Sequence, residues 1–422
     1  MNSLMGRTAD EPKIEIAGSP ISTDWYLLLL FLIGIFLPSS LSGYLSSLLI
    51  GLSYGIALFL LAYGGWKLGA SESAMIYCLL PILIILSLCT VLWSRDDIRI
   101  AKLGVYAASA LMFCLRWKPS PLRYGNHILL AGSAANIVMG VGIIAHWGPV
   151  TDFVNRFYAA FVDDLVSTML ALHKPVLTYG THSLAAFFIY LFYWMNFRTF
   201  EATKAKINLV FAILHAALCA AVLSHTSFVF ALLAFAEMGW YLLRHARCAT
   251  IAFALAIAIG LPAALSRIDP DLRTWADLGR VARDVVVFTW MDKEGGFGGR
   301  FSAGGNMAAP IAYIADHPFS PIGLSTRKDF VLDDSGPVEY MIRGSVLLVV
   351  LMYGGAWYFL RAHLPRWDAL RLFLCIAAME VGFSVLTYHR ALFLLPACLL
   401  YLSSLGCTAT MDGVRSRPSK AS

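Results

Sequence analysis

Long apolar runs dominate the chain and alternate with short polar segments. A run of about 20 apolar residues is long enough to cross the hydrocarbon core of a bilayer as a helix. Such runs lie at 25–41, 44–63, 74–93, 100–116, 126–145, 182–198, 207–223, 228–243, 248–265, 338–361, 369–387 and 390–407. The pattern therefore predicts an all-α polytopic membrane protein with about twelve transmembrane helices.

Basic residues give this bundle an orientation and a division into segments. Lysines and arginines gather beside alternate ends of the runs and in the C-terminal tail, so the positive-inside rule places both termini in the cytoplasm. The predicted segments are a cytoplasmic tail (1–24), spans one to nine (25–265) with an amphipathic outer loop at 146–181, a large outer loop (266–337), spans ten to twelve (338–407) and a second tail (408–422).

Composition excludes several classes of protein. Hydrophobic residues make up 59% of the chain and charged residues 14%, which is outside the range of soluble globular domains. The net charge of +6 follows from the basic cytoplasmic side and does not indicate nucleic-acid binding. All eight cysteines lie in or beside apolar runs, so we expect buried thiols, no disulfide framework, no metal site and no cofactor.

The first outer loop predicts an amphipathic helix that lies in the membrane interface. Aromatic and aliphatic residues recur at helical spacing over 152–175, opposite charged residues. Thr181 or Ser183 can cap the next span, which places His182 at its outer mouth. His182 either bonds to a backbone carbonyl there or contacts a polar substrate.

The second outer loop opens with another amphipathic pattern, at 269–290, and then turns irregular. Asp269 and Asp271 are better explained by the start of a helix than by a metal site. Six glycines between 295 and 305 disfavour regular structure around Arg300. Arg300 is either an incidental surface residue or a forked cation that holds a phosphate or diphosphate in two hydrogen bonds.

The loop closes with a short helix and the start of span ten. A helix over 308–315 must end before Pro318, which leaves His317 at its C-terminal corner. Ser335 and Pro337 are typical of a helix start. Asp334 is therefore either a cap of this span or a functional carboxylate.

These motifs resemble a known family. Gly-Arg at 299–300, His-Pro-x-x-x-x-Gly at 317–323, Asp-Ser-Gly at 334–336 and Arg-Gly at 343–344 are similar to motifs of the Wzy-type polysaccharide polymerases and their relatives, the O-antigen ligases. Nearly all of the resemblance lies in about 293–360. At the positions of Asp334 and Ser335, O-antigen ligases usually carry His followed by Asn, Ser or Gln. The xanthan-type polymerase is therefore the preferred subgroup.

The resemblance implies a glycosyltransferase-C-like fold and a metal-independent enzyme at the periplasmic face of a bacterial inner membrane. It would polymerise polyprenyl-diphosphate-linked oligosaccharide repeat units in exopolysaccharide synthesis, beside a flippase and chain-length or export proteins. Arg300, Asp334 and His317 are the expected catalytic residues. The expected substrate-binding residues are Arg327, Arg343, His182, His389 and Arg390. O-antigen-ligase-like transfer and lipid-linked oligosaccharide transport remain as alternatives.

Overall fold

The computed structural model describes residues 23–38, 44–68, 72–93, 98–117, 120–159, 169–245 and 335–415, together with 167, 276, 301, 304–325, 327 and 330. Within these residues the secondary structure is helical, with one isolated β-bridge between Ile98 and Ser325. The predicted span 248–265, the amphipathic segment 269–290, Arg300 and Asp334 lie outside the described residues.

The helices follow the apolar runs closely. Their bounds are α1 Thr23–Phe36, α2 Tyr44–Leu68, α3 Glu72–Ala74, η1 Met75–Leu79, α4 Leu80–Trp93, α5 Ile100–Cys114, α6 Gly125–Ile144, α7 Gly148–Val154, η2 Asn155–Ala159, α9 His182–Thr203, α10 Lys206–Ala221, α11 His225–His245, α15 Ala308–Asp316, α16 Gly336–His363, α17 Arg366–Glu380, η3 Val385–Thr387 and α18 His389–Arg415. Each predicted span except 248–265 overlaps a helix of the described residues, but 369–387 is not one helix, because α17 ends at Glu380 and the short helix η3 follows at Val385. Five helical stretches are long and apolar enough to cross a membrane, and several others are apolar but shorter. The chain is thus a helical membrane protein, and the number twelve stays a prediction.

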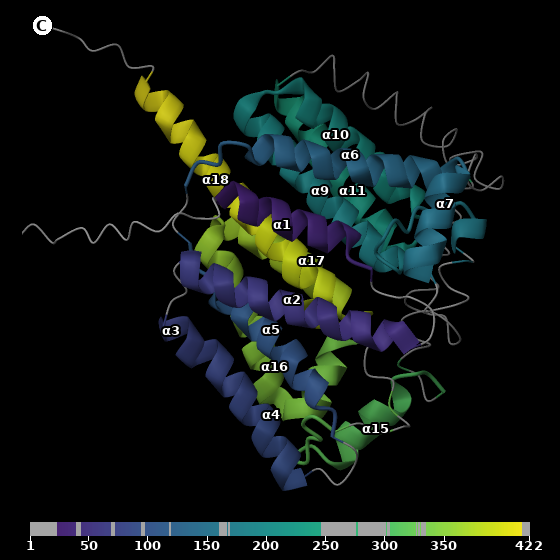
Figure 1. Ribbon diagram of the computed structural model, residues 1–422, viewed down its shortest axis with the longest axis vertical. Helices are drawn as coiled ribbons and strands as arrows, with labels where there is room; N and C mark the ends of the chain where they lie inside the picture. Colours follow the sequence, from purple (N-terminus) through teal and green to yellow (C-terminus); the bar gives the residue numbers. More distant parts are fainter. Residues whose placement is uncertain are drawn as a thin grey trace, which may run out of the picture.

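Two groups of helices flank a central layer (Figure 1). We call α6, α7, α9, α10 and α11 the α9 lobe, and α2 to α5 with α15 and α16 the α16 lobe. Helices α1, α17 and α18 lie between the lobes, and α18 packs along α1, α9 and α2. The side chains of α9 from Leu184 to Phe197 are buried, so this helix is the core of its lobe.

The helices α7 and α15, which are described helices of the two expected outer loops, lie at one end of the bundle (Figure 1). α1 also finishes at this end, and α18 begins there. We call it the loop end, and we call the opposite end, where α18 finishes, the terminus end.

The loop helices test the predicted bounds. α15 ends at Asp316 with His317 as its C-cap, which confirms the predicted short helix. Thr181 caps α9 and accepts a hydrogen bond from the Leu184 N–H at 3.3 Å, as predicted. The amphipathic helix expected over 152–175 was placed wrongly at its start, because α7 already begins at Gly148 and a π-helical turn follows it. Pro149 in the first turn explains the earlier start.

Candidate functional site

The centre of the loop end is a break in α16. Gly344 and Ser345 leave the helical conformation, and Ser345 has a φ of 61°. The carbonyls of Ile342 and Arg343 instead accept hydrogen bonds from the N–H groups of Ile322 at 2.8 Å and Gly323 at 3.0 Å. Irregular backbone in a membrane bundle needs such partners. The break thus provides a docking place for the segment that follows α15.

The docked segment, residues 322–325, is also held from its other side. Its Leu324 N–H donates to Oγ1 of Thr90 at 2.8 Å, and its Leu324 carbonyl accepts from the Arg99 N–H at 3.0 Å. Gly323 has a φ of 59°, and a Cβ at this position would collide with the backbone of Thr90. Only glycine fits both conditions, which gives the last residue of His-Pro-x-x-x-x-Gly a structural reason.

A cluster of charged side chains lies beside the docked segment. We call Lys102, Glu339, Arg343 and Ser384 the Glu339 cluster. Oε1 of Glu339 accepts from Nε of Arg343 at 2.9 Å and from Nζ of Lys102 at 3.2 Å, and Oε2 accepts from Ser384 at 3.0 Å. Arg343 also donates to the carbonyls of Gly323 at 3.0 Å and Ser325 at 3.2 Å. Two cations therefore share one carboxylate, and one of them fastens the docked segment.

The two cations of this cluster, Lys102 and Arg343, differ in how far their side chains are exposed. The side chains of Glu339 and Arg343 are each 1% exposed, whereas that of Lys102 is 22% exposed. A ligand that approaches from outside would meet Lys102 before Arg343. Arg343 was predicted as a substrate-binding residue, and in this structure its hydrogen bonds position the protein's own backbone.

A second buried carboxylate closes the cluster on the side of α17. Glu380 is fully buried, and its Oε1 accepts from the Leu386 N–H at 2.6 Å. Its other oxygen lies so close to Gly336 that a Cβ there would collide with it. The glycine of Asp-Ser-Gly therefore leaves room for the Glu380 carboxylate where α16 and α17 meet, and a side chain there would displace this carboxylate.

His317 and Arg327 lie together on the surface of α15. A small core of Met307, Ile322, Val338 and Ile342 packs this region onto α16. The rings of His317 and Tyr313 are 5.0 Å apart, and the guanidinium of Arg327 lies 5.0 Å from the centre of the Tyr313 ring. His317 is exposed. These two predicted residues are thus brought together at the loop end.

The remaining predicted residues lie where α9 and α18 begin. His182 is the first residue of α9, and His389 is the first of α18, buried against the rings of Tyr54 and Tyr388. Arg390 is fully buried, and it donates to three carbonyls at the end of α1, those of Gly34 and Ile35 at 2.9 Å and Leu37 at 2.8 Å. These bonds cap α1 and account for Arg390 without a substrate.

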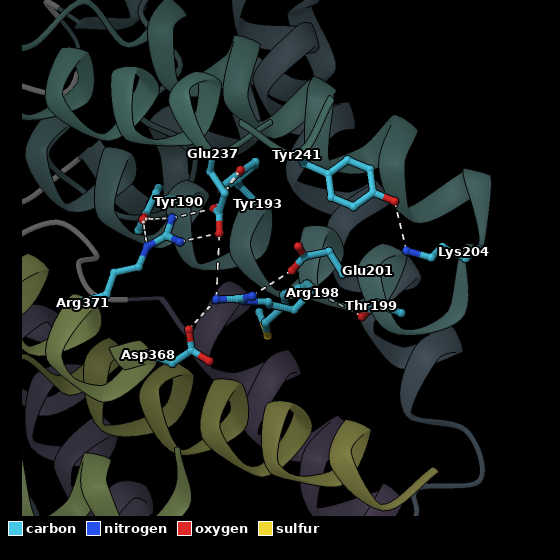
Figure 2. A network of polar contacts seen from close by, with 11 residues as sticks. Tyr190, Tyr193, Arg198, Thr199, Glu201, Lys204, Glu237, Tyr241, Asp368 and Arg371 are labelled. Carbon is cyan, nitrogen blue, oxygen red and sulfur yellow. Dashed lines mark hydrogen bonds and ion pairs between the residues drawn. The ribbon is translucent and has the colours of Figure 1, made fainter. Parts of the chain in front are cut away.

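A second charged network lies nearer the terminus end (Figure 2). It joins Arg198 and Glu201 of α9, Glu237 of α11, and Asp368 and Arg371 of α17. Sequence reasoning treated both arginines as part of the cytoplasmic basic bias and missed their partners. It also missed Lys102 and Glu339, which fall in apolar runs. Lys102 and Glu339 could have been found from the sequence, because a charged residue inside an apolar run is unusual in membrane helices and indicates a partner.

Comparison with known proteins adds no assignment to this geometry. No family model matches the chain, and no curated protein or solved structure is detectably similar to it. Among the described residues, no three His, Cys, Asp or Glu side chains come together as a possible metal site. The chemistry of the site must therefore be argued from its own residues.

Proposed function

We propose that the protein polymerises polyprenyl-diphosphate-linked oligosaccharide repeat units at the loop end of its bundle. One observation supports this proposal above the others. Segments far apart in the chain, at 99–102, 317–327, 339–343 and 380–390, meet at the end that holds both expected outer loops. Cations, carboxylates and an exposed histidine are thus supplied at one end of the bundle.

The cations suit a lipid-linked diphosphate donor. When an acceptor hydroxyl attacks the anomeric carbon, the bond from that carbon to the diphosphate oxygen breaks and negative charge develops on the leaving diphosphate. Preplaced cations stabilise that charge most in a site with little water. Lys102 and Arg327 are partly exposed cations near the docked segment, Arg99 is exposed there as well, and Arg300 would add a further cation. Arg343 is then a positioning residue that holds the docked segment.

The acceptor hydroxyl must also lose a proton. His317 is exposed and held at the end of α15 against Tyr313, so it is the described group best placed to accept that proton. Asp334 remains the second possibility, one residue before the N-cap Ser335. The products would be a lengthened saccharide, still on its own lipid diphosphate, and a free polyprenyl diphosphate anion, while His317 keeps the proton of the acceptor hydroxyl until water removes it.

Lipid-linked oligosaccharide profiling of a deletion strain tests the proposal. A polymerase deletion accumulates single repeat units on their lipid at the outer face of the membrane. A ligase deletion accumulates long lipid-linked polymer, and that result would overturn the proposal.

The network in Figure 2 favours a transporter as the second candidate function. Charged side chains among membrane helices often mark a transport path. A flippase deletion would leave single units at the inner face. Both deletions therefore leave single units, and the face of the membrane on which these units accumulate separates the two candidates.

A further inference from the structure

The charged network between α17 and the α9 lobe has two layers. Nearer the helix ends, Arg198 of α9 contacts Asp368 of α17 and donates to Glu201 at 2.8 Å. Further into the bundle, Arg371 of α17 pairs with both oxygens of Glu237 of α11, at 2.5 and 2.6 Å. A distance of 4.0 Å between Arg198 and Glu237 connects the layers.

Two tyrosines of α9 complete the inner layer. Tyr190 accepts from Nε of Arg371 at 2.8 Å, and the Tyr193 hydroxyl donates to Oε2 of Glu237 at 2.9 Å. Figure 2 shows these side chains converging from helices on both sides. The contacts that join α17 to α9 and α11 within this network are thus ion pairs and hydrogen bonds, and each needs the partner helix in place.

The stability of the interface between α17 and the α9 lobe depends on these charged pairs, because little other packing joins α17 to α9. α17 packs extensively against α16 and only over a short stretch against α9. The side chains of Arg198, Glu237, Asp368 and Arg371 are 17–31% exposed, in contrast to the 1% of the Glu339–Arg343 pair. Water that already reaches the charges can hydrate them when they separate, so breaking these pairs costs much less than breaking a fully buried pair.

We propose that these four residues form an ionic lock that closes the interface between α17 and the α9 lobe at the terminus end, and that the lock opens in the working protein. The opposite end of α17 carries Glu380 against Gly336 of α16. If α17 moves when the lock opens, this contact between Glu380 and Gly336 at the loop end would change as well. The lock is independent of the proposed function, since a polymerase and a transporter could both use it.

The chain carries a native reporter for this movement. Cys375 lies one turn beyond Arg371 on α17, is 5% exposed, and approaches the Tyr190 hydroxyl. Cys219 is a matched control because it is 1% exposed and contacts the Ala186 and Ser227 carbonyls inside the α9 lobe. Opening of the lock should expose Cys375 and leave Cys219 covered.

The test is maleimide alkylation of the full chain in liposomes, with each cysteine followed by peptide mass spectrometry. In the unaltered protein, raising the salt from about 0.05 M to about 1 M should accelerate alkylation of Cys375 several-fold, because salt screens charges that water reaches. Alkylation of Cys219 should not change. If the alkylation rate of Cys375 does not depend on the salt concentration, the proposal that the lock opens is wrong.

Variants then assign the effect to the lock. Glu237→Gln and Asp368→Asn should each raise the Cys375 rate by about tenfold or more, while Glu201→Gln should not, because the ion-pair partner of Glu201 among the described residues is Arg198 of its own helix. If the alkylation rate of Cys219 rises in parallel, or if Glu201→Gln raises the Cys375 rate equally, the variants loosen the whole bundle. Either result would contradict the lock.

Discussion

Replacing Arg343 by methionine should destabilise the protein far more than the same replacement of Lys102. Both changes remove one positive charge from the Glu339 cluster and introduce the same side chain. Arg343 is 1% exposed and holds Glu339, Gly323 and Ser325 through bonds of 2.9 to 3.2 Å. Lys102 is 22% exposed and donates to Glu339 at 3.2 Å.

The expected magnitudes follow from this difference. Removing one member of a buried ion pair costs about 3–5 kcal/mol, because the other charge stays buried. Lys102 remains beside Glu339 and offsets part of that cost, but two backbone carbonyls also lose a donor at about 1 kcal/mol each. We expect about 4 kcal/mol for Arg343→Met. For Lys102→Met we expect about 1 kcal/mol, since its charge is partly solvated.

The assay is reversible unfolding in mixed micelles of mild detergent and sodium dodecyl sulfate, followed by circular dichroism. Limited proteolysis between 301 and 330 supplies a local readout, because the docked segment loses its anchor in Arg343→Met and keeps it in Lys102→Met. Equal destabilisation of the two variants would refute the positioning role that we assign to Arg343.

Four further results are expected. Arg390→Met should lower the free energy of unfolding by about 3 kcal/mol, because three carbonyls at the end of α1 lose their donor; a loss under about 1 kcal/mol in the same assay would contradict the capping role. Thr181→Ala should cost about 1 kcal/mol and Thr181→Asn much less, since asparagine also caps helices. Lys102→Met should weaken binding of undecaprenyl diphosphate by about tenfold, as expected for one charge-assisted contact, and leave binding of the uncharged polyprenol unchanged in a fluorescence-quenching titration. His317→Ala should slow polymer formation by about a hundredfold or more with unfolding unaffected; an unchanged rate would move the proton acceptor to Asp334.

The sequence predicts the helices well because hydrocarbon imposes a length and an apolar composition on every span. It also predicts the ends that local chemistry fixes, as Thr181 and His317 show. The bounds of α7 were missed because Pro149 starts the helix before the charged pattern begins. A π-helical turn then shifts the register that the amphipathic pattern assumed.

The candidate site was less predictable, because its contacts join residues far apart in the chain. Nothing near Lys102 in the sequence indicates that it faces Glu339, and nothing near Arg371 indicates Glu237. Positive charge at helix ends was explained completely by the positive-inside rule, so Arg198 and Arg371 needed no partners in that interpretation. The motif glycines show the opposite case: Gly323 and Gly336 were noticed as a family pattern, and the structure gives each a packing reason.

Reconstitution tests the central claim most directly. The purified protein is placed in liposomes with polyprenyl-diphosphate-linked repeat units, and the saccharides are released and separated by gel electrophoresis. We expect a ladder of polymer, together with free polyprenyl diphosphate, that weakens in Lys102→Met. Repeat units that remain single, or that only cross the bilayer, would contradict the assignment as a polymerase.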